Sequence, residues 1–297
     1  MSKRKLSTTR DSVSNKLKDD LDVKRFAGIS LAGGKTDKAA IAIMEYYPKH
    51  RKVFLSHLID KIKSDEKISG DLKIHQHLTQ DFQPLNQVAF DVPLTLPKCL
   101  RCRLKCPGYE LCSEPEISWL WDSYNKRNKQ KRPKKLFTPY TERCTETYIS
   151  SSLEEAFHPS HALGANLAPV FARGQFIQRR LKLKTMEVYP RLSLWRIGRS
   201  LGIQKSYLRS HKHSVEGETI RRAILEKLSE KNVAFLYSQD VRLMVSDSHC
   251  FDAFICAFTA ILKSVKQCEA KPKGYPKSEG WVEFPAKKID WKWCQGE

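Results

Sequence analysis

The chain has 297 residues, of which 40% are hydrophobic, so it can bury a sizeable core and is not expected to be disordered throughout. No run approaches the roughly 18 apolar residues of a membrane span, and the N-terminus lacks the apolar stretch of a signal peptide, which favours a cytoplasmic protein without a membrane partner. The formal charge of +20 favours polyanionic partners, with nucleic acid, DNA or RNA, as the first candidate.

Residues 1–24 are polar and charged, which predicts a flexible basic arm before one domain over 25–297. The stretch GISLAGGKTDKAAIAI that follows contains the letters of a phosphate-binding loop. Such a loop needs four residues between its first glycine and the Gly-Lys pair, whereas five separate Gly28 from Gly34. We therefore expect a strand over 26–31, a glycine turn and a returning strand over 39–46.

Further along the chain, apolar patterning predicts an alternation of strands and helices. Residues 97–150 are rich in Cys and Lys and lack a regular pattern, so we expect an insertion there. The expected strands are 50–60, 87–94, 185–190 and an edge strand in 279–285, and the expected helical segments are 70–82, 159–183, 192–201, 218–231 and 246–266.

Positive charge gathers in two stretches. Residues 126–135 carry seven Lys or Arg in ten, and residues 173–212 add a second basic run. Either run alone fits a solvated face, but together they indicate a binding surface for nucleic acid. In FTPYTERCTE, hydroxyl and arginine side chains suit phosphate contacts, with an ordinary turn as the alternative. The expected binding residues are Lys131, Arg132, Lys134, Tyr140, Arg143, Arg179 and Arg180.

Three acids stand in apolar surroundings, where an unpaired carboxylate costs several kcal/mol. They are Asp91, Glu187 and Asp252. Each one could pair with a cationic side chain or a backbone N–H. Alternatively, all three converge on a divalent cation, Mg²⁺ or Mn²⁺, which positions water for attack on phosphorus. The helix SDSHCFDAFICAFTAIL favours convergence, because His249 lies one turn from Asp252 and can ligate or orient water.

Four cysteines lie within fourteen residues in CLRCRLKCPGYELC: Cys99, Cys102, Cys106 and Cys112. A chance cluster of reduced thiols is one interpretation. Metal ligation is the other, because short loops let successive sulfurs turn towards one metal. The spacing leaves Zn²⁺ and a [4Fe–4S] cluster equally open.

Several segments carry a resemblance to a known family, among them GISLAGGKTDKAAIA, FDVPLTLP, FTPYTERCTE, MEVYPRLSLWRIGRSLGI and HCFDAFICAFTAIL. They resemble the domain of unknown function 429 family, whose members are predicted nucleases with an RNase H-like fold, similar to Holliday-junction resolvases. The resemblance implies a mixed five-stranded sheet flanked by helices, an α/β fold, with Asp91, Glu187 and Asp252 at a catalytic metal site.

One residue departs from that pattern. The first strand usually carries an aspartate that bridges two metals, and Ser30 stands at this position. The leading hypothesis is a metal-dependent nuclease, and the alternative is a catalytically weakened nucleic-acid-binding protein on the same fold. A nucleotide-binding enzyme of the actin-like or sugar kinase class would need two domains around its ligand, and the chain offers one.

Overall fold

We describe the computed structural model over residues 22–33, 38–129, 137–164, 166–213 and 215–295. The predicted arm and the tip of the glycine turn lie largely outside these residues. The strands are β1 (Lys24–Leu31), β2 (Ala39–Tyr47), β3 (Lys52–Ile62), β4 (Gln87–Phe90), β5 (Thr185–Val188) and β6 (Val282–Glu283). The helices are α2 (Gly70–Gln76), η1 (His77–Asp81), α3 (Lys98–Arg101), α4 (Pro115–Lys129), α5 (Cys144–Ser151), α6 (Ala168–Gln178), α7 (Pro190–Ser200), α8 (Lys205–Leu208), α9 (Gly217–Glu230), α10 (Ser238–Ser246), α11 (Ser248–Ser264) and η2 (Trp291–Trp293).

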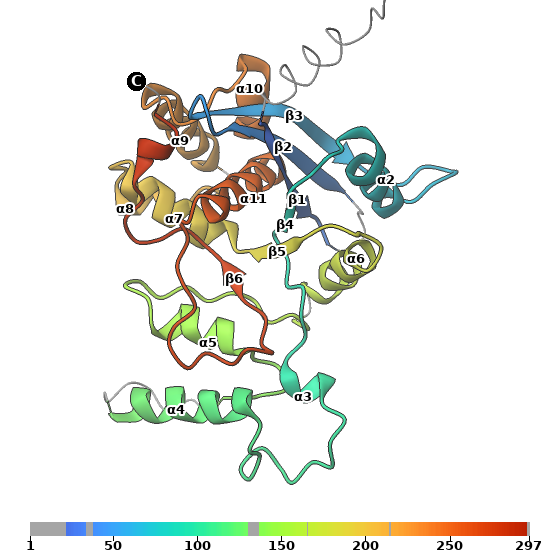
Figure 1. Ribbon diagram of the computed structural model, residues 1–297, viewed down its shortest axis with the longest axis vertical. Helices are drawn as coiled ribbons and strands as arrows, with labels where there is room; N and C mark the ends of the chain where they lie inside the picture. Colours follow the sequence, from blue (N-terminus) through green and yellow to red (C-terminus); the bar gives the residue numbers. More distant parts are fainter. Residues whose placement is uncertain (1–21, 34–37, 130–136, 165, 214, 296–297) are drawn as a thin grey trace, which may run out of the picture.

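The strands form one mixed sheet in the order β3-β2-β1-β4-β5-β6 (Figure 1). β1, β2 and β3 pair antiparallel, whereas β4, β5 and β6 continue the sheet in parallel with β1. The fold is therefore α/β with six strands, whereas the family resemblance implied a five-stranded sheet. The sixth strand is the two-residue β6, which lies where the sequence predicts an edge strand and pairs with β5 at the edge of the sheet.

Each face of the sheet packs into its own core, because successive strand residues point to opposite sides. α11 covers one face across β1, β2 and β4, with α7 and α10 packed beside it. α2 and α6 cover the other face (Figure 1). In β1, Phe26 belongs to the α11 side, and Ala27, Ile29 and Leu31 belong to the α6 side.

The contact between β1 and α11 is unusually close. A Cβ added at Gly28 would stand 2.0 Å from the backbone oxygen of Ala253 and 2.3 Å from the backbone nitrogen of Ala257. Only glycine fits here, because helix backbone cannot yield as a flexible side chain can. This packing places the first turn of α11 beside the end of β1, where Ser30 lies.

Residues 97–150 are more regular than the sequence predicted. They contain α3, α4 and α5, which lie at the lower end of the molecule in Figure 1, below β6. The prediction of an irregular segment was wrong for α4, which begins at Pro115, a favoured first helical residue, and buries Ile117 and Leu120.

No single helix in the described part of the chain has both the length and the apolarity to cross a membrane. α10 and α11 together meet those criteria as a pair bent by 116°. In the fold, α11 buries most of its apolar residues in the core of the α11 side of the sheet.

Candidate functional site

Asp91 stands directly after β4, at the carboxyl end of the parallel strands. The following proline at position 93 cannot donate a ladder hydrogen bond, which helps to end the strand here. One carboxylate oxygen, Oδ1, accepts the backbone N–H of Leu31 at 3.1 Å, and Oδ2 accepts the hydroxyl of Ser30 at 2.5 Å. Burial, followed by the negative charge of Asp252, raises the pKa of Asp91 to about 6.

Asp252 lies on the second turn of α11 and is fully buried. Its Oδ1 is 3.3 Å from Nε2 of His211, and its Oδ2 forms an ion pair with the ammonium group of Lys212. Burial alone would raise the pKa of Asp252, but the charge of Lys212 and the contacts with His211 together outweigh it and lower that pKa to about 2. The attraction is mutual, because the negative charge of Asp252 raises the pKa of Lys212 to about 12.

His249 and Ser30 connect the helix to the first strand. Nδ1 of His249 lies 2.9 Å from Oγ of Ser30, which is completely buried. A serine hydroxyl has one proton. When Ser30 donates it to ionised Asp91, neutral His249 must carry its own proton on Nδ1 to share this contact. Burial, followed by the positive charge of Lys212, lowers the pKa of His249, which favours that neutral form.

Asp91 and Asp252 border one open cavity of about 500 Å³, which we name the acid–base pocket. Asp91 and Asp252 supply its acidic side, and the loop before α9 supplies most of its basic side. The residues lining it are Asp91, Tyr189, Pro190, Arg191, Arg209, Ser210, His211, Lys212, His213 and Asp252. A pocket with two convergent carboxylates and several cations can hold a phosphate ester and a metal ion together.

Glu187 does not join this pair, contrary to the expectation that three acids converge. Its two oxygens accept hydrogen bonds from the guanidinium of Arg143 at 2.8 and 2.7 Å. Strand parity explains the difference: Met186 and Val188 face the α11 side, so Glu187 faces the other side. Asp91, by contrast, reaches Ser30 on the α11 side.

Arg143 is likewise not placed to bind nucleic acid, which corrects that expectation. It is only 2% exposed and pairs with Glu146 as well as Glu187. Burial alone would lower the pKa of Arg143, but the negative charges of Glu187 and Glu146 outweigh it and raise that pKa. Its Nη1 also donates to the side chain of Thr95 at 3.1 Å. The FTPYTERCTE segment therefore contributes a buried ionic network rather than a phosphate contact at this arginine.

The other expected binding residues are dispersed. Tyr140 is 50% exposed, and Arg179 and Arg180 are exposed beyond the end of α6, on the opposite face of the sheet from α11. Arg180 covers the ring of Phe176 at 3.6 Å. Lys131, Arg132 and Lys134 lie outside the described residues. The described contacts thus do not gather these side chains around the acid–base pocket.

All nine cysteines are free, and the four that were expected to bind metal line a separate cavity. Among the described residues, no three His, Cys, Asp or Glu side chains are grouped so as to hold a single metal ion. This applies both to the cysteines and to the three acids as they stand.

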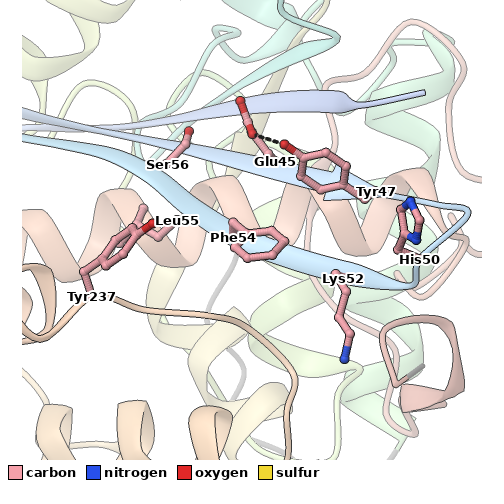
Figure 2. Close-up of a pocket in the computed structure, with 8 residues that line it drawn as sticks. All are labelled: Glu45, Tyr47, His50, Lys52, Phe54, Leu55, Ser56 and Tyr237. Atoms are coloured by element: carbon pink, nitrogen blue, oxygen red, sulfur yellow. Dashed lines mark hydrogen bonds between the residues drawn. The ribbon is translucent and has the colours of Figure 1, made fainter. Parts of the chain in front are cut away.

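A larger cavity, of about 610 Å³, lies along β3. Figure 2 shows Glu45 in it, bonded to the hydroxyl of Tyr47 at 2.6 Å. Glu45 also accepts from Arg25 at 2.7 Å, so the acid in this cavity is already neutralised. With aromatic walls and no second carboxylate, this cavity lacks the paired acids of the acid–base pocket.

Lys212 and His211 were not singled out from the sequence. The signal that pointed to them was the basic run ending in RSHKH, which indicated charge without indicating a partner. Their role follows from the loop between α8 and α9, which carries them to the first turns of α11, about 40 residues later in the chain.

Comparison with known proteins adds a family but no characterised relative. A search of curated proteins and a search of solved structures each find no match. One family model, described as a protein of unknown function (DUF429), matches residues 69–273, a span that includes β4, β5, α11 and the acid–base pocket. Because this model covers more than half of the chain, the protein belongs to the DUF429 family.

Proposed function

We propose that this protein is a metal-dependent nuclease that hydrolyses phosphodiester bonds of DNA or RNA in the acid–base pocket. The observation that carries the proposal is the meeting of Asp91 and Asp252, from β4 and α11, on a pocket that also presents Arg191 and Lys212. Two carboxylates that meet at one pocket are stabilised by a cation between or beside them, a place that Lys212 already takes at Asp252.

The sheet supports this function. Three antiparallel strands followed by parallel β4 and β5, with a helix crossing β1, agree with the RNase H-like arrangement that the sequence resembles. In open α/β sheets, ligands bind outside the carboxyl ends of the strands, which is where Asp91 lies. Fold likeness alone does not specify an activity, so the side chains of the pocket carry the argument.

The two carboxylates fit one divalent cation, not two. Mg²⁺ is commonly held by one or two carboxylates together with substrate phosphate and water. Ser30 supplies a hydroxyl where a third carboxylate would stand, and Glu187 is bound to Arg143. The ion pair between Lys212 and Asp252 must open for the cation to bind. When bound, the cation would stabilise negative charge on phosphorus and lower the pKa of a water molecule.

The chain's own residues supply binding and proton positions. Arg191 and Lys212 attract the phosphate backbone, and the ammonium of Lys212, once released from Asp252, can neutralise a phosphate oxygen. The hydrogen bond from Nδ1 of His249 to Ser30 leaves Nε2 as the unprotonated nitrogen of a neutral imidazole. That nitrogen can orient a water molecule by accepting its proton in a hydrogen bond.

A second candidate is a nucleic-acid-binding protein on the same fold with weakened catalysis. Two observations favour it: Ser30 replaces a carboxylate, and Lys212 already balances the charge of Asp252. In that case the pocket would bind phosphate without cleaving it.

The test uses single-stranded, duplex and branched DNA and RNA with Mg²⁺, Mn²⁺ or EDTA. Wild-type protein should cleave in the presence of a divalent cation, and Asp252→Asn should abolish cleavage, whereas the surface variant Asp65→Asn should not. Binding without cleavage, together with a gain of cleavage in Ser30→Asp, would select the second candidate. Neither binding nor cleavage by any of these proteins would reject both functions.

A further inference from the structure

Cys99 of α3 and three cysteines of the loop between α3 and α4, Cys102, Cys106 and Cys112, line one cavity. Its volume is about 230 Å³, and it is separate from the acid–base pocket. The residues lining it are Lys98, Cys99, Cys102, Leu104, Lys105, Cys106, Pro107, Tyr109, Cys112, Ser113, Glu114 and Ile117. All four sulfur-bearing residues therefore face a common space, although up to thirteen positions separate them in the chain.

The loop is fixed by contacts that do not involve sulfur. Nε1 of Trp121 on α4 donates to the backbone oxygen of Tyr109 at 3.2 Å, and the Tyr109 ring stacks on Trp121. At the other end, Nε of Arg101 donates to the backbone oxygen of Leu96 at 2.8 Å. Contacts at both ends of the loop therefore fix the backbone that carries the cysteines around the cavity.

All four thiol-bearing residues line this one cavity. Four thiolates around one cavity repel each other unless a positively charged group lies among them. A metal centre provides that charge and takes thiolates as ligands.

The size of the cavity bears on whether a single ion or a cluster would fill it. Zinc holds its sulfurs at about 2.3 Å, which puts the sulfurs only about 3.8 Å from each other in a tetrahedron. A cavity that admits one water needs only about 10–15 Å³, so 230 Å³ leaves room for a group of several atoms.

We propose that Cys99, Cys102, Cys106 and Cys112 ligate one [4Fe–4S] cluster in this cavity. Each thiol loses its proton on binding, so four thiolates and a cluster core of charge +2 give a site of charge −2. Lys105 lines the cavity and offsets part of this charge, whereas the ammonium of Lys98 is paired with Glu114 at 2.6 Å. The tight run of cysteines, with Pro107 directly after Cys106, is compatible with cluster ligation.

The exposure of the site predicts sensitivity to oxygen. Cys106 is exposed, and Leu104, which lines the cavity, is 66% exposed. A cluster ligated here would lie near the surface, where oxidants reach its irons. Purification in air is therefore expected to remove it, and the experiment must be anaerobic.

The test is metal analysis of the full-length chain purified without oxygen and, in parallel, reconstituted with Fe²⁺ and sulfide under argon. We expect about four iron and about four acid-labile sulfide per chain, with a broad visible absorption that dithionite bleaches. Cys106→Ser and Cys112→Ser should lose most of the iron. Cys268→Ser, outside the loop and able to keep its hydrogen bond to the backbone of Thr259, should retain it.

Three results would overturn the proposal. About one zinc per chain that iron cannot replace would indicate a mononuclear site. Failure of anaerobic reconstitution in a folded protein would indicate ordinary thiols, and full iron binding by Cys106→Ser would place the cluster elsewhere. Because each readout is metal content or a spectrum, none depends on whether the acid–base pocket cleaves nucleic acid.

Discussion

Replacing Asp91 with asparagine should make the protein more stable at alkaline pH. The ordinary pKa of this carboxyl is 3.8, and in the folded protein it is raised to about 6. A difference of about 2 pKa units corresponds to about 3 kcal/mol of unfolding free energy, since each unit is worth about 1.4 kcal/mol. This cost arises because burial disfavours the ionised carboxylate, and the negative charge of Asp252 adds to that effect.

The sign of the effect follows from proton linkage. A raised carboxyl pKa means that the folded state holds the proton more tightly than the unfolded state. Well below pH 4 both states are protonated and the group costs nothing, and near pH 4 the cost is still small. The cost grows as the pH rises from about 4 to about 6, because the unfolded carboxyl ionises while the native one keeps its proton, and it is complete at pH 8. Asparagine never ionises, and it can still accept from the N–H of Leu31 and donate to Ser30.

Urea unfolding in EDTA at pH 4 and pH 8 provides the assay. Asp91→Asn should match the wild type at pH 4 and exceed it by up to about 3 kcal/mol at pH 8. Mg²⁺ should stabilise the wild type and narrow the gap. Asp65→Asn is a control of opposite sign, because a hydrogen bond from Lys73 lowers the pKa of Asp65 to about 2. If Asp91→Asn lowered the free energy of unfolding by the same amount at pH 4 and pH 8, the reasoning would be refuted.

Three further predictions concern packing, the buried ion pairs and the basic side of the pocket. Gly28→Ala places a methyl carbon 2.0 Å from backbone of α11, so unfolding should occur at clearly lower urea, by about 3 kcal/mol or more; an unchanged midpoint would contradict the packing. Glu187→Gln leaves Arg143 with one buried charge partner, so the free energy of unfolding should fall by about 3 kcal/mol. The affinity for Mn²⁺, measured by calorimetry, should stay the same, and a lower affinity would show that Glu187 does bind the metal. Arg191→Gln should reduce the magnitude of the slope of log affinity for nucleic acid against log salt concentration by about 1. Arg180→Gln, on the other face of the sheet, should leave this slope unchanged. The reverse result would indicate that the nucleic-acid backbone binds beside α6.

Strand patterns were predictable because they are local. The expected strands 26–31 and 39–46 are observed as β1 and β2 with small extensions, and Asp91 does stand at the tip of a buried strand. Asp247 caps α11 by accepting the backbone N–H of His249, and aspartate is a locally favoured residue at this position. These features depend on neighbouring residues and on the two-residue period of a strand.

The composition of the site was less predictable because it depends on which residues meet across the fold. Side chains alternate between the two faces of the sheet along β5, and this alternation turns Glu187 away from Asp91. The sequence alone does not give the register of β5 against β4, so it does not show which face each residue takes. Lys212 reaches Asp252 from a loop whose course no local pattern specifies. The helix α4 was missed because its many charged and polar residues hide the few apolar ones that it buries.

The ion pairs of Arg143 have a consequence for anyone who shortens this chain. That single guanidinium joins α5, through Glu146, to the central sheet, through Glu187. A deletion that removes residues 97–150 would remove Arg143 and leave the buried carboxylate of Glu187 without its ion-pair partner. Truncated versions should therefore replace Glu187 with a residue such as methionine, or they will fail for a reason unrelated to the cysteines they were made to remove.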